Sequence, residues 1–346
     1  MIRVDLVTGF LGSGKTTFLR HYARYLTNLG EKVCILENDY GAINVDRLLL
    51  QDLEGDRCSV EMIVGGDGPE AHRRRLKTKL IAMAMLGYDR VVVEPSGVYD
   101  VDEFFDILYE EPLDRWYETG SVIAVVPADA GGTASGDSDI SADGASGQVK
   151  GEASAALTSD VDLNSDGSAA AREYFLMAQA AAAGCVLFSR VQECSEEQIE
   201  TAEEYLQSLL VKYHCAHELR FLAKDWNDLT QDDFAMLSSC GYRHADHVKI
   251  AAEELGGYES HFYFHPVLSR EQLLGAVGKA FSDPSCGKIL RIKGCIREGA
   301  DSAAPQWLSF NATAQKTELQ PVANGQEVVI IIGEGLHPEV LDRYFK

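Results

Sequence analysis

Short apolar runs recur along the first two thirds of the chain, separated by stretches in which apolar residues return with helical spacing. The runs predict buried strands over 2–7, 32–36, 90–93, 121–126 and 185–188. The helical spacing predicts helices over 16–28, about 67–86 and about 196–213. Because strands and helices alternate, we expect an α/β fold with a mostly parallel sheet covered on both faces.

The C-terminal part follows a different pattern, in which strands outnumber helices. It predicts strands over 260–264, 289–296, 307–310 and 328–332, and helices over 270–281 and 338–344. This order suggests a smaller α+β domain with an antiparallel sheet.

A segment at about 127–171 interrupts the first pattern. Gly, Ala, Ser and Asp dominate it, so few of its residues can enter a core, and we interpret it as a solvated insertion. The predicted organisation is a first domain over 1–225, a linker over 226–257 and a second domain over 258–346.

Residues Gly9–Thr16 read GxxxxGKT between a predicted strand and a predicted helix. This context makes the segment a P-loop, whose backbone N–H groups cradle phosphate oxygens. Lys15 is expected to contact the β- and γ-phosphates, and the Thr16 hydroxyl to ligate Mg²⁺. The predicted nucleotide-binding residues of this loop are Gly9, Gly12, Ser13, Gly14, Lys15, Thr16 and Thr17.

A Mg²⁺–nucleotide site also needs a carboxylate at the end of a neighbouring strand. Glu94 ends the predicted strand 90–93 and is followed by Pro95-Ser96-Gly97. We expect Glu94 to act with Lys15 in catalysis by holding Mg²⁺ or the attacking water. The N–H of Gly97 is a candidate sensor of the γ-phosphate.

These segments resemble the CobW-like GTPases, relatives of the GTPases that insert nickel into urease and hydrogenase. The resemblance is carried by GFLGSGKTT at Gly9–Thr17, ENDYGAINVD at Glu37–Asp46 and VVVEPSG at Val91–Gly97. Near the C-terminus, Arg291-Ile292-Lys293-Gly294 is similar to the RxKG strand of the CobW C-terminal domain, and 329–342 is similar to its last strand and helix.

The resemblance implies a P-loop GTPase that binds GTP and Mg²⁺ and serves metal trafficking or metallocentre assembly. Its partner would be a client metalloprotein or cofactor enzyme, and Asp39 would belong to the first switch and help to hold Mg²⁺. A nucleotide-binding regulatory module, with lost metal transfer and little hydrolysis, is the alternative.

One departure from the family concerns metal. Members usually carry GCxCC where this chain reads Val64-Gly65-Gly66-Asp67-Gly68-Pro69, without a cysteine. Glu37, Asp39 and Asp67 could supply oxygen ligands for a second divalent metal, and oxygen suits Mg, Mn or Ca better than Zn. Asp67 could instead cap the helix that follows it.

Another departure concerns the base. In place of [NT]KxD the chain has Ser189-Arg190-Val191-Gln192. Arg190 can stack on the base as the Lys would, but the amide of Gln192 turns a donor towards a guanine donor. An unpaired buried donor costs about 1–3 kcal/mol, so the preference for GTP over ATP is weakened.

Charge and composition narrow the classes of partner that we expect. A net charge of −23 repels nucleic acid and anionic membranes, and we expect neither as a partner. The chain has no long apolar stretch and no signal-peptide pattern, and its eight cysteines form no CxxC, which suggests reduced thiols in the cytoplasm.

Overall fold

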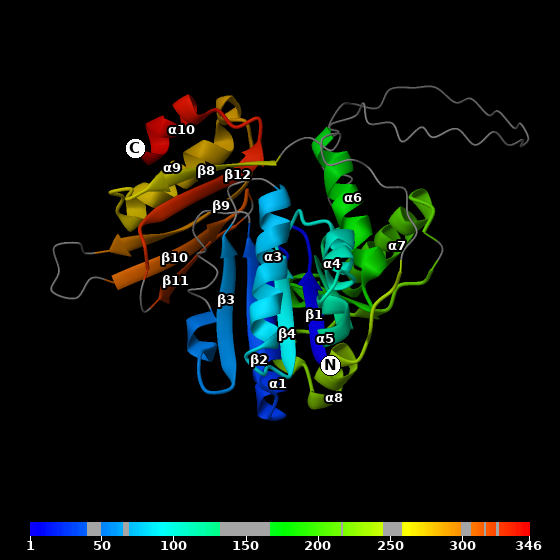
Figure 1. Cartoon of the computed structure of the whole chain (residues 1–346). Coiled ribbons are helices and arrows are strands. Elements are labelled where there is room, and N and C mark those ends of the chain that lie inside the picture. Colours follow the sequence, from blue (N-terminus) through cyan, green and yellow to red (C-terminus); the bar gives the residue numbers. More distant parts are fainter. Residues whose placement is uncertain are drawn as a thin grey trace, which may run out of the picture.

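The computed structural model describes residues 1–39, 50–64, 69–131, 167–215, 217–244, 258–298, 306–314, 316–322 and 325–346. Two sheets organise these residues (Figure 1). The strands are β1 Ile2–Thr8, β2 Val33–Asp39, β3 Cys58–Val64, β4 Arg90–Pro95, β5 Tyr117–Pro127, β6 Cys185–Ser189, β7 Phe221–Leu222, β8 Tyr258–Phe264, β9 Lys288–Glu298, β10 Gln306–Ala312, β11 Thr317–Val322 and β12 Val328–Glu334. The α-helices are α1 Lys15–Asn28, α3 Pro69–Ala84, α4 Val101–Leu108, α5 Leu113–Trp116, α6 Gly167–Ala182, α7 Glu196–Lys212, α8 Gln231–Ser238, α9 Arg270–Ser282 and α10 Pro338–Phe345.

The first sheet confirms the predicted α/β class. Its seven strands run in the order β3-β2-β4-β1-β5-β6-β7, and every pair in it is parallel. β1 lies between β4 and β5 in the middle of the sheet. The loop after β1 and the residues that end β4 and β6 therefore share one edge, where the carboxyl ends of parallel strands create a ligand crevice.

Both faces of this sheet are buried, as the continuous apolar strands require. Along β4, Val91 and Val93 belong to one apolar core and Val92 to the other. The first core is covered by α3, α4, α6 and α7, whereas α1 and α8 cover the second. Because α1 carries the predicted phosphate lysine at its first residue, this packing fixes the P-loop against the sheet.

The second sheet is antiparallel and runs β11-β10-β9-β12-β8. Its apolar face packs against α9 and α10 through a core that includes Ile292, Phe310 and Ile331. Gly294 makes room in this core, because a Cβ there would lie 2.7 Å from the Phe310 ring. The first sheet's strands point towards this second unit, coloured yellow to red in Figure 1. The predicted antiparallel α+β unit is confirmed.

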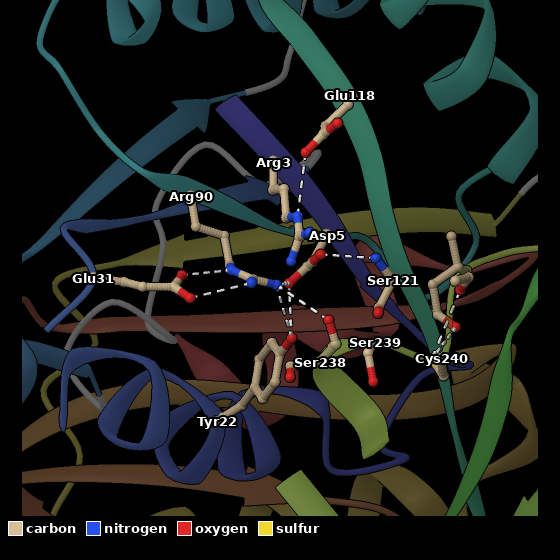
Figure 2. Close-up of polar contacts among 12 residues, drawn as sticks. Arg3, Asp5, Tyr22, Glu31, Arg90, Glu118, Ser121, Ser238, Ser239 and Cys240 are labelled. Carbon is tan, nitrogen blue, oxygen red and sulfur yellow. Dashed lines mark hydrogen bonds and ion pairs between the residues drawn. The ribbon is translucent and has the colours of Figure 1, made fainter. Parts of the chain in front are cut away.

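A buried polar network ties the first sheet together away from the carboxyl ends of its strands (Figure 2). Arg90 Nη1 donates to Asp5 Oδ2 at 2.7 Å, and the Tyr22 hydroxyl donates to the same oxygen at 2.7 Å. The backbone N–H of Ser121 donates to Asp5 Oδ1 at 2.8 Å, while Arg90 Nε donates to Glu31 at 2.7 Å. The network joins β1, β4, β5 and α1, which are the elements that build the phosphate site.

Several predictions fall partly outside the described residues. Of the segment 127–171, only its ends are described, where β5 finishes at Pro127 and α6 begins at Gly167. Within the stretch 226–257, α8 (Gln231–Ser238) packs on α1. No helix in the described part of the chain is long and apolar enough to span a bilayer.

Candidate functional site

The loop between β1 and α1 has the strained backbone that its glycines allow. Gly9, Gly12 and Gly14 have φ of 151°, 75° and 98°. A Cβ at Gly9 would lie 2.3 Å from the carbonyl oxygen of Val125, so only glycine fits between the loop and β5. Gly14 is the N-cap of α1 and offers no side-chain cap, which leaves the positive end of the helix dipole facing the loop. The loop is therefore shaped for an anion.

The side chain of Lys15 folds back over this loop. Its Nζ donates to the carbonyl oxygen of Gly9 at 2.8 Å and to that of Phe10 at 3.4 Å. The ammonium is thus held beside the phosphate-binding backbone, and only 7% of the residue is exposed. A phosphate oxygen would compete with these carbonyls for the same donor.

Thr16 and Glu94 meet across the crevice between α1 and β4. The Thr16 hydroxyl donates to Glu94 Oε1 at 2.7 Å, and Glu94 is buried. A hydroxyl and a carboxylate in contact are hard oxygen donors of the kind Mg²⁺ prefers. The donor set fits a magnesium ion bound by one or two protein oxygens, with nucleotide phosphates and water completing its shell.

The other predicted metal residues are less fully described. Glu37 is buried on β2, directly opposite Glu94 in the strand register. The side chain of Asp39 and the whole of Asp67 lie outside the described residues. Within the described part of the chain, no three His, Cys, Asp or Glu side chains gather closely enough to hold a metal ion.

Gly97 is placed against the P-loop rather than in the cavity. A Cβ there would lie 2.5 Å from the backbone nitrogen of Leu11, and the carbonyl oxygen of Gly97 accepts a hydrogen bond from Gln179 Nε2 at 3.0 Å. The segment after β4 therefore lies in direct contact with the backbone of the P-loop.

The residues after β6 reach the other end of the loop. Arg190 Nη2 donates to the carbonyl oxygen of Gly12 at 3.1 Å, so its guanidinium spans from the candidate base site to the P-loop. Arg190 adopts φ of 59°, and the buried Ser189 precedes it at the end of β6. Gln192 also lines the cavity described below.

Three further residues of this end were missed from the sequence: Asp225, Trp226 and Asn227. Trp226 Nε1 donates to the carbonyl oxygen of Phe188 at 3.0 Å, and its ring edge lies 2.9 Å from where a Cβ of Gly14 would stand. Asp225 Oδ1 accepts from the backbone and side chain of Asn227 at 2.8 and 3.0 Å. The strand that precedes them, β7, has only two residues and is too short to show an apolar pattern in the sequence.

These groups line a cavity of about 370 Å³. On the first unit it is lined by the predicted residues Gly12, Ser13, Gly14, Lys15, Thr16, Thr17, Glu94, Ser189 and Arg190. The second unit closes the opposite side with residues of β9, β10 and β11. This size is that of a small-molecule site, and a phosphate loop, two oxygen donors and an aromatic ring meet in it.

Comparison with known proteins agrees with this arrangement. Residues 3–214 match the family model described as CobW/HypB/UreG, nucleotide-binding domain. Among curated relatives, the zinc chaperone YjiA of Escherichia coli is 32% identical over 135 residues, which cover 37% of this chain and 41% of the relative. The zinc chaperone YeiR of the same organism is 28% identical over 127 residues, covering 36% and 38%. The matches thus span about two fifths of the relatives' length.

Matches among solved structures include Zn(II)-bound YjiA GTPase from E. coli, with 19% identity and a TM-score of 0.36 over 99% of this chain and 98% of that one. HypB from Helicobacter pylori in complex with nickel has 15% identity and a TM-score of 0.37 over 68% and 82%.

Proposed function

Because the chain belongs to the CobW/HypB/UreG family of nucleotide-binding proteins, we propose that it binds GTP with Mg²⁺, hydrolyses it slowly, and acts as a switch in metallocentre or cofactor-enzyme assembly. The observation that carries this proposal is the contact of Thr16 with Glu94 at 2.7 Å beside the P-loop lysine. The three groups come from the start of α1 and the end of β4, as Mg²⁺–nucleotide chemistry requires.

In this proposal the P-loop amides and Lys15 bind the β- and γ-phosphates, and Lys15 exchanges its two carbonyl partners for phosphate oxygens. Thr16 and Glu94 would hold Mg²⁺, which neutralises charge that develops on the phosphates. Catalysis would rest on positioning and electrostatic stabilisation by Lys15, Mg²⁺ and Glu94, and we propose that the intrinsic rate is slow.

The base would lie between Arg190 and the residues that follow β7. The Arg190 guanidinium is already tied to the P-loop and can stack on a purine. Gln192 weakens the guanine preference for the reason given above, whereas the Asp225 carboxylate at the same cavity can accept guanine hydrogen bonds. We therefore keep GTP as the proposed nucleotide and ATP as its competitor.

The role in metal trafficking rests on the family and on relatives named as zinc chaperones. We propose a client metalloprotein or cofactor enzyme as partner, in the cytoplasm, and the domain division 1–225, 226–257 and 258–346. Metal cargo without thiolates would use oxygens of Glu37, Asp39 and Asp67.

Calorimetric titration with non-hydrolysable GTP and ATP analogues, with and without Mg²⁺, tests the proposal. Wild type is compared with Lys15→Ala and with a control, Lys79→Ala, which removes a lysine of α3 that pairs with Glu61 of β3. We expect Mg²⁺-dependent binding that favours GTP, is lost in Lys15→Ala and is unchanged in the control.

Equal binding of the two analogues, or tighter binding of the ATP analogue, would mean that the base site does not select guanine. Tight binding of the analogues, together with no Mg²⁺-dependent release of phosphate from GTP itself in a separate assay, would support the regulatory module instead. Binding that survives Lys15→Ala would refute the assignment of this loop.

A further inference from the structure

The two faces of the second sheet differ chemically over β9, β10 and β11. On β9, Ile292 and Ile296 belong to the core beneath α9 and α10. Because side chains alternate along a strand, Arg291 and Lys293 lie on the opposite face. That face lines the nucleotide cavity with polar groups of three neighbouring strands: Arg291, Lys293, Ser309, Asn311, Glu318 and Gln320.

Two cations are held on this face. Arg291 Nε donates to Asn311 Oδ1 at 2.7 Å, an interaction with the adjacent strand that orients the guanidinium. Lys293 is only 4% exposed, although it lines the cavity. Both cations therefore lie on the cavity wall that the second sheet forms.

The charge of the cavity differs from that of the whole chain. Six Lys or Arg residues line it against four Asp or Glu residues, in a chain whose net charge is −23. The cations are Lys15, Arg20, Arg190, Arg291, Lys293 and Lys316, and the carboxylates are Glu94, Glu193, Asp225 and Glu318. Half of these cations come from the second unit, namely Arg291 and Lys293 on β9 and Lys316 just before β11. Such a concentration of positive charge is suited to a polyphosphate.

The second sheet also reaches the phosphate loop directly. Thr313 Cγ2 lies 3.8 Å from where a Cβ of Gly12 would stand. Lys316 Nζ lies 2.9 Å from Glu318 and 3.5 Å from Glu193, which follows β6 on the first unit. The polar face therefore forms a wall of the same cavity and stands within reach of a ligand on the P-loop.

We propose that the polar face of the second sheet is the second half of the nucleotide site, and that Arg291 and Lys293 bind phosphate oxygens of a nucleoside di- or triphosphate held by the P-loop. This inference rests on the proposed function, because it needs a nucleotide in the cavity. A bound polyphosphate would then join the two units through charge-assisted hydrogen bonds.

The test measures the affinity of the non-hydrolysable GTP analogue for Arg291→Gln and Lys293→Met. Their matched control is Arg297→Gln, because Arg297 is on the same strand and face but stacks over Trp307 outside the cavity. We expect each cavity variant to bind the analogue about tenfold to a hundredfold more weakly, since the loss of a hydrogen bond to a charged group weakens binding by about this factor. Arg297→Gln should bind like wild type.

A measurement on the wild-type protein guards against variants that fail to fold. An acyl-phosphate derivative of GTP transfers its acyl group to a nearby lysine: the Nζ attacks the acyl carbon, an amide forms, and the nucleotide leaves. We expect peptide mapping to find acylated Lys15 and Lys293, and excess GTP analogue to protect both.

The two proposals fail differently. The second half of the site would be overturned if Arg291→Gln and Lys293→Met bound the analogue like Arg297→Gln and Lys293 stayed unlabelled. If Lys15→Ala still lost binding in that case, the proposed function would stand. An absence of nucleotide binding by wild type would refute both.

Discussion

Arg90→Met should be among the most destabilising single changes in the first unit. The Arg90 side chain is 4% exposed and that of Asp5 is fully buried, at 2.7 Å from each other. Removing the guanidinium leaves the Asp5 carboxylate in the core with only the Tyr22 hydroxyl and the Ser121 N–H (Figure 2). Breaking a buried ion pair in this way costs about 3–5 kcal/mol. For a unit of this size the midpoint of thermal unfolding should fall by about 6–20 °C.

The double variant Asp5→Asn with Arg90→Met tests the cause. If the cost arises from an unpaired buried charge, removing both charges should recover most of it, since replacement of both partners can be nearly neutral. Arg3→Met is the matched control, because Arg3 lies on the same strand as Asp5 but its side chain is 53% exposed and pairs with Glu118, whose side chain is 44% exposed. We expect at most about 1 kcal/mol for it.

The penalty should also depend on pH. Burial raises the pKa of Asp5, and the charge of Arg90 opposes this shift, so loss of Arg90 raises the pKa further. A carboxyl whose folded pKa exceeds its unfolded value weakens the folded state once it is ionised. The deficit of Arg90→Met should therefore shrink as the pH falls through the raised pKa.

Urea unfolding followed by circular dichroism at several pH values measures these free energies. Our reasoning would be refuted if Arg90→Met cost no more than Arg3→Met, or if the double variant lost the sum of the two single changes.

Two further predictions concern the elements beside the candidate base site. Lys224 and the cap of α8 lower the pKa of Asp233 to about 2. A carboxyl with a lowered pKa in the folded state stabilises the fold at pH values above its pKa in the unfolded chain, and this stabilisation is lost as the pH falls towards 2. Asp233→Asn should thus lower stability by about 1 kcal/mol at pH 7, and the difference from wild type in urea unfolding should vanish near pH 2. Trp226→Phe removes the hydrogen bond to Phe188, and we expect it to abolish a nucleotide-dependent change in tryptophan emission that wild type shows; an unchanged signal would place the base elsewhere.

The first sheet was predictable because its central strands are apolar on both faces. The runs at 90–93 and 121–126 became the interior of β4 and β5, with alternate residues entering two cores. The P-loop was predictable for another reason: its chemistry depends on glycines at fixed spacing, and their positive φ values are local properties.

Elements with weaker apolar patterns were missed. β11 is an edge strand whose residues are all exposed or half-buried, and its sequence TELQPV has few apolar side chains that could enter a core. β3 reads CSVEMIV, in which a serine and a glutamate interrupt the run. Trp226 and Lys293 escaped notice as site residues because only tertiary contacts bring them to the loop that binds phosphate.

The placement of these tertiary contacts has a thermodynamic consequence. If Arg291 and Lys293 bind phosphate, nucleotide binding stabilises the contact between the two units by the same free energy that their loss removes from nucleotide affinity. Linkage requires the converse: a partner that draws the second sheet away from the P-loop must weaken nucleotide binding by the same factor. A client that docks on the second unit could therefore promote nucleotide release without touching Lys15 or Glu94. The two-faced β9 supplies the physical element for such coupling, since its apolar side fixes the strand to α9 and α10 while its polar side faces the ligand.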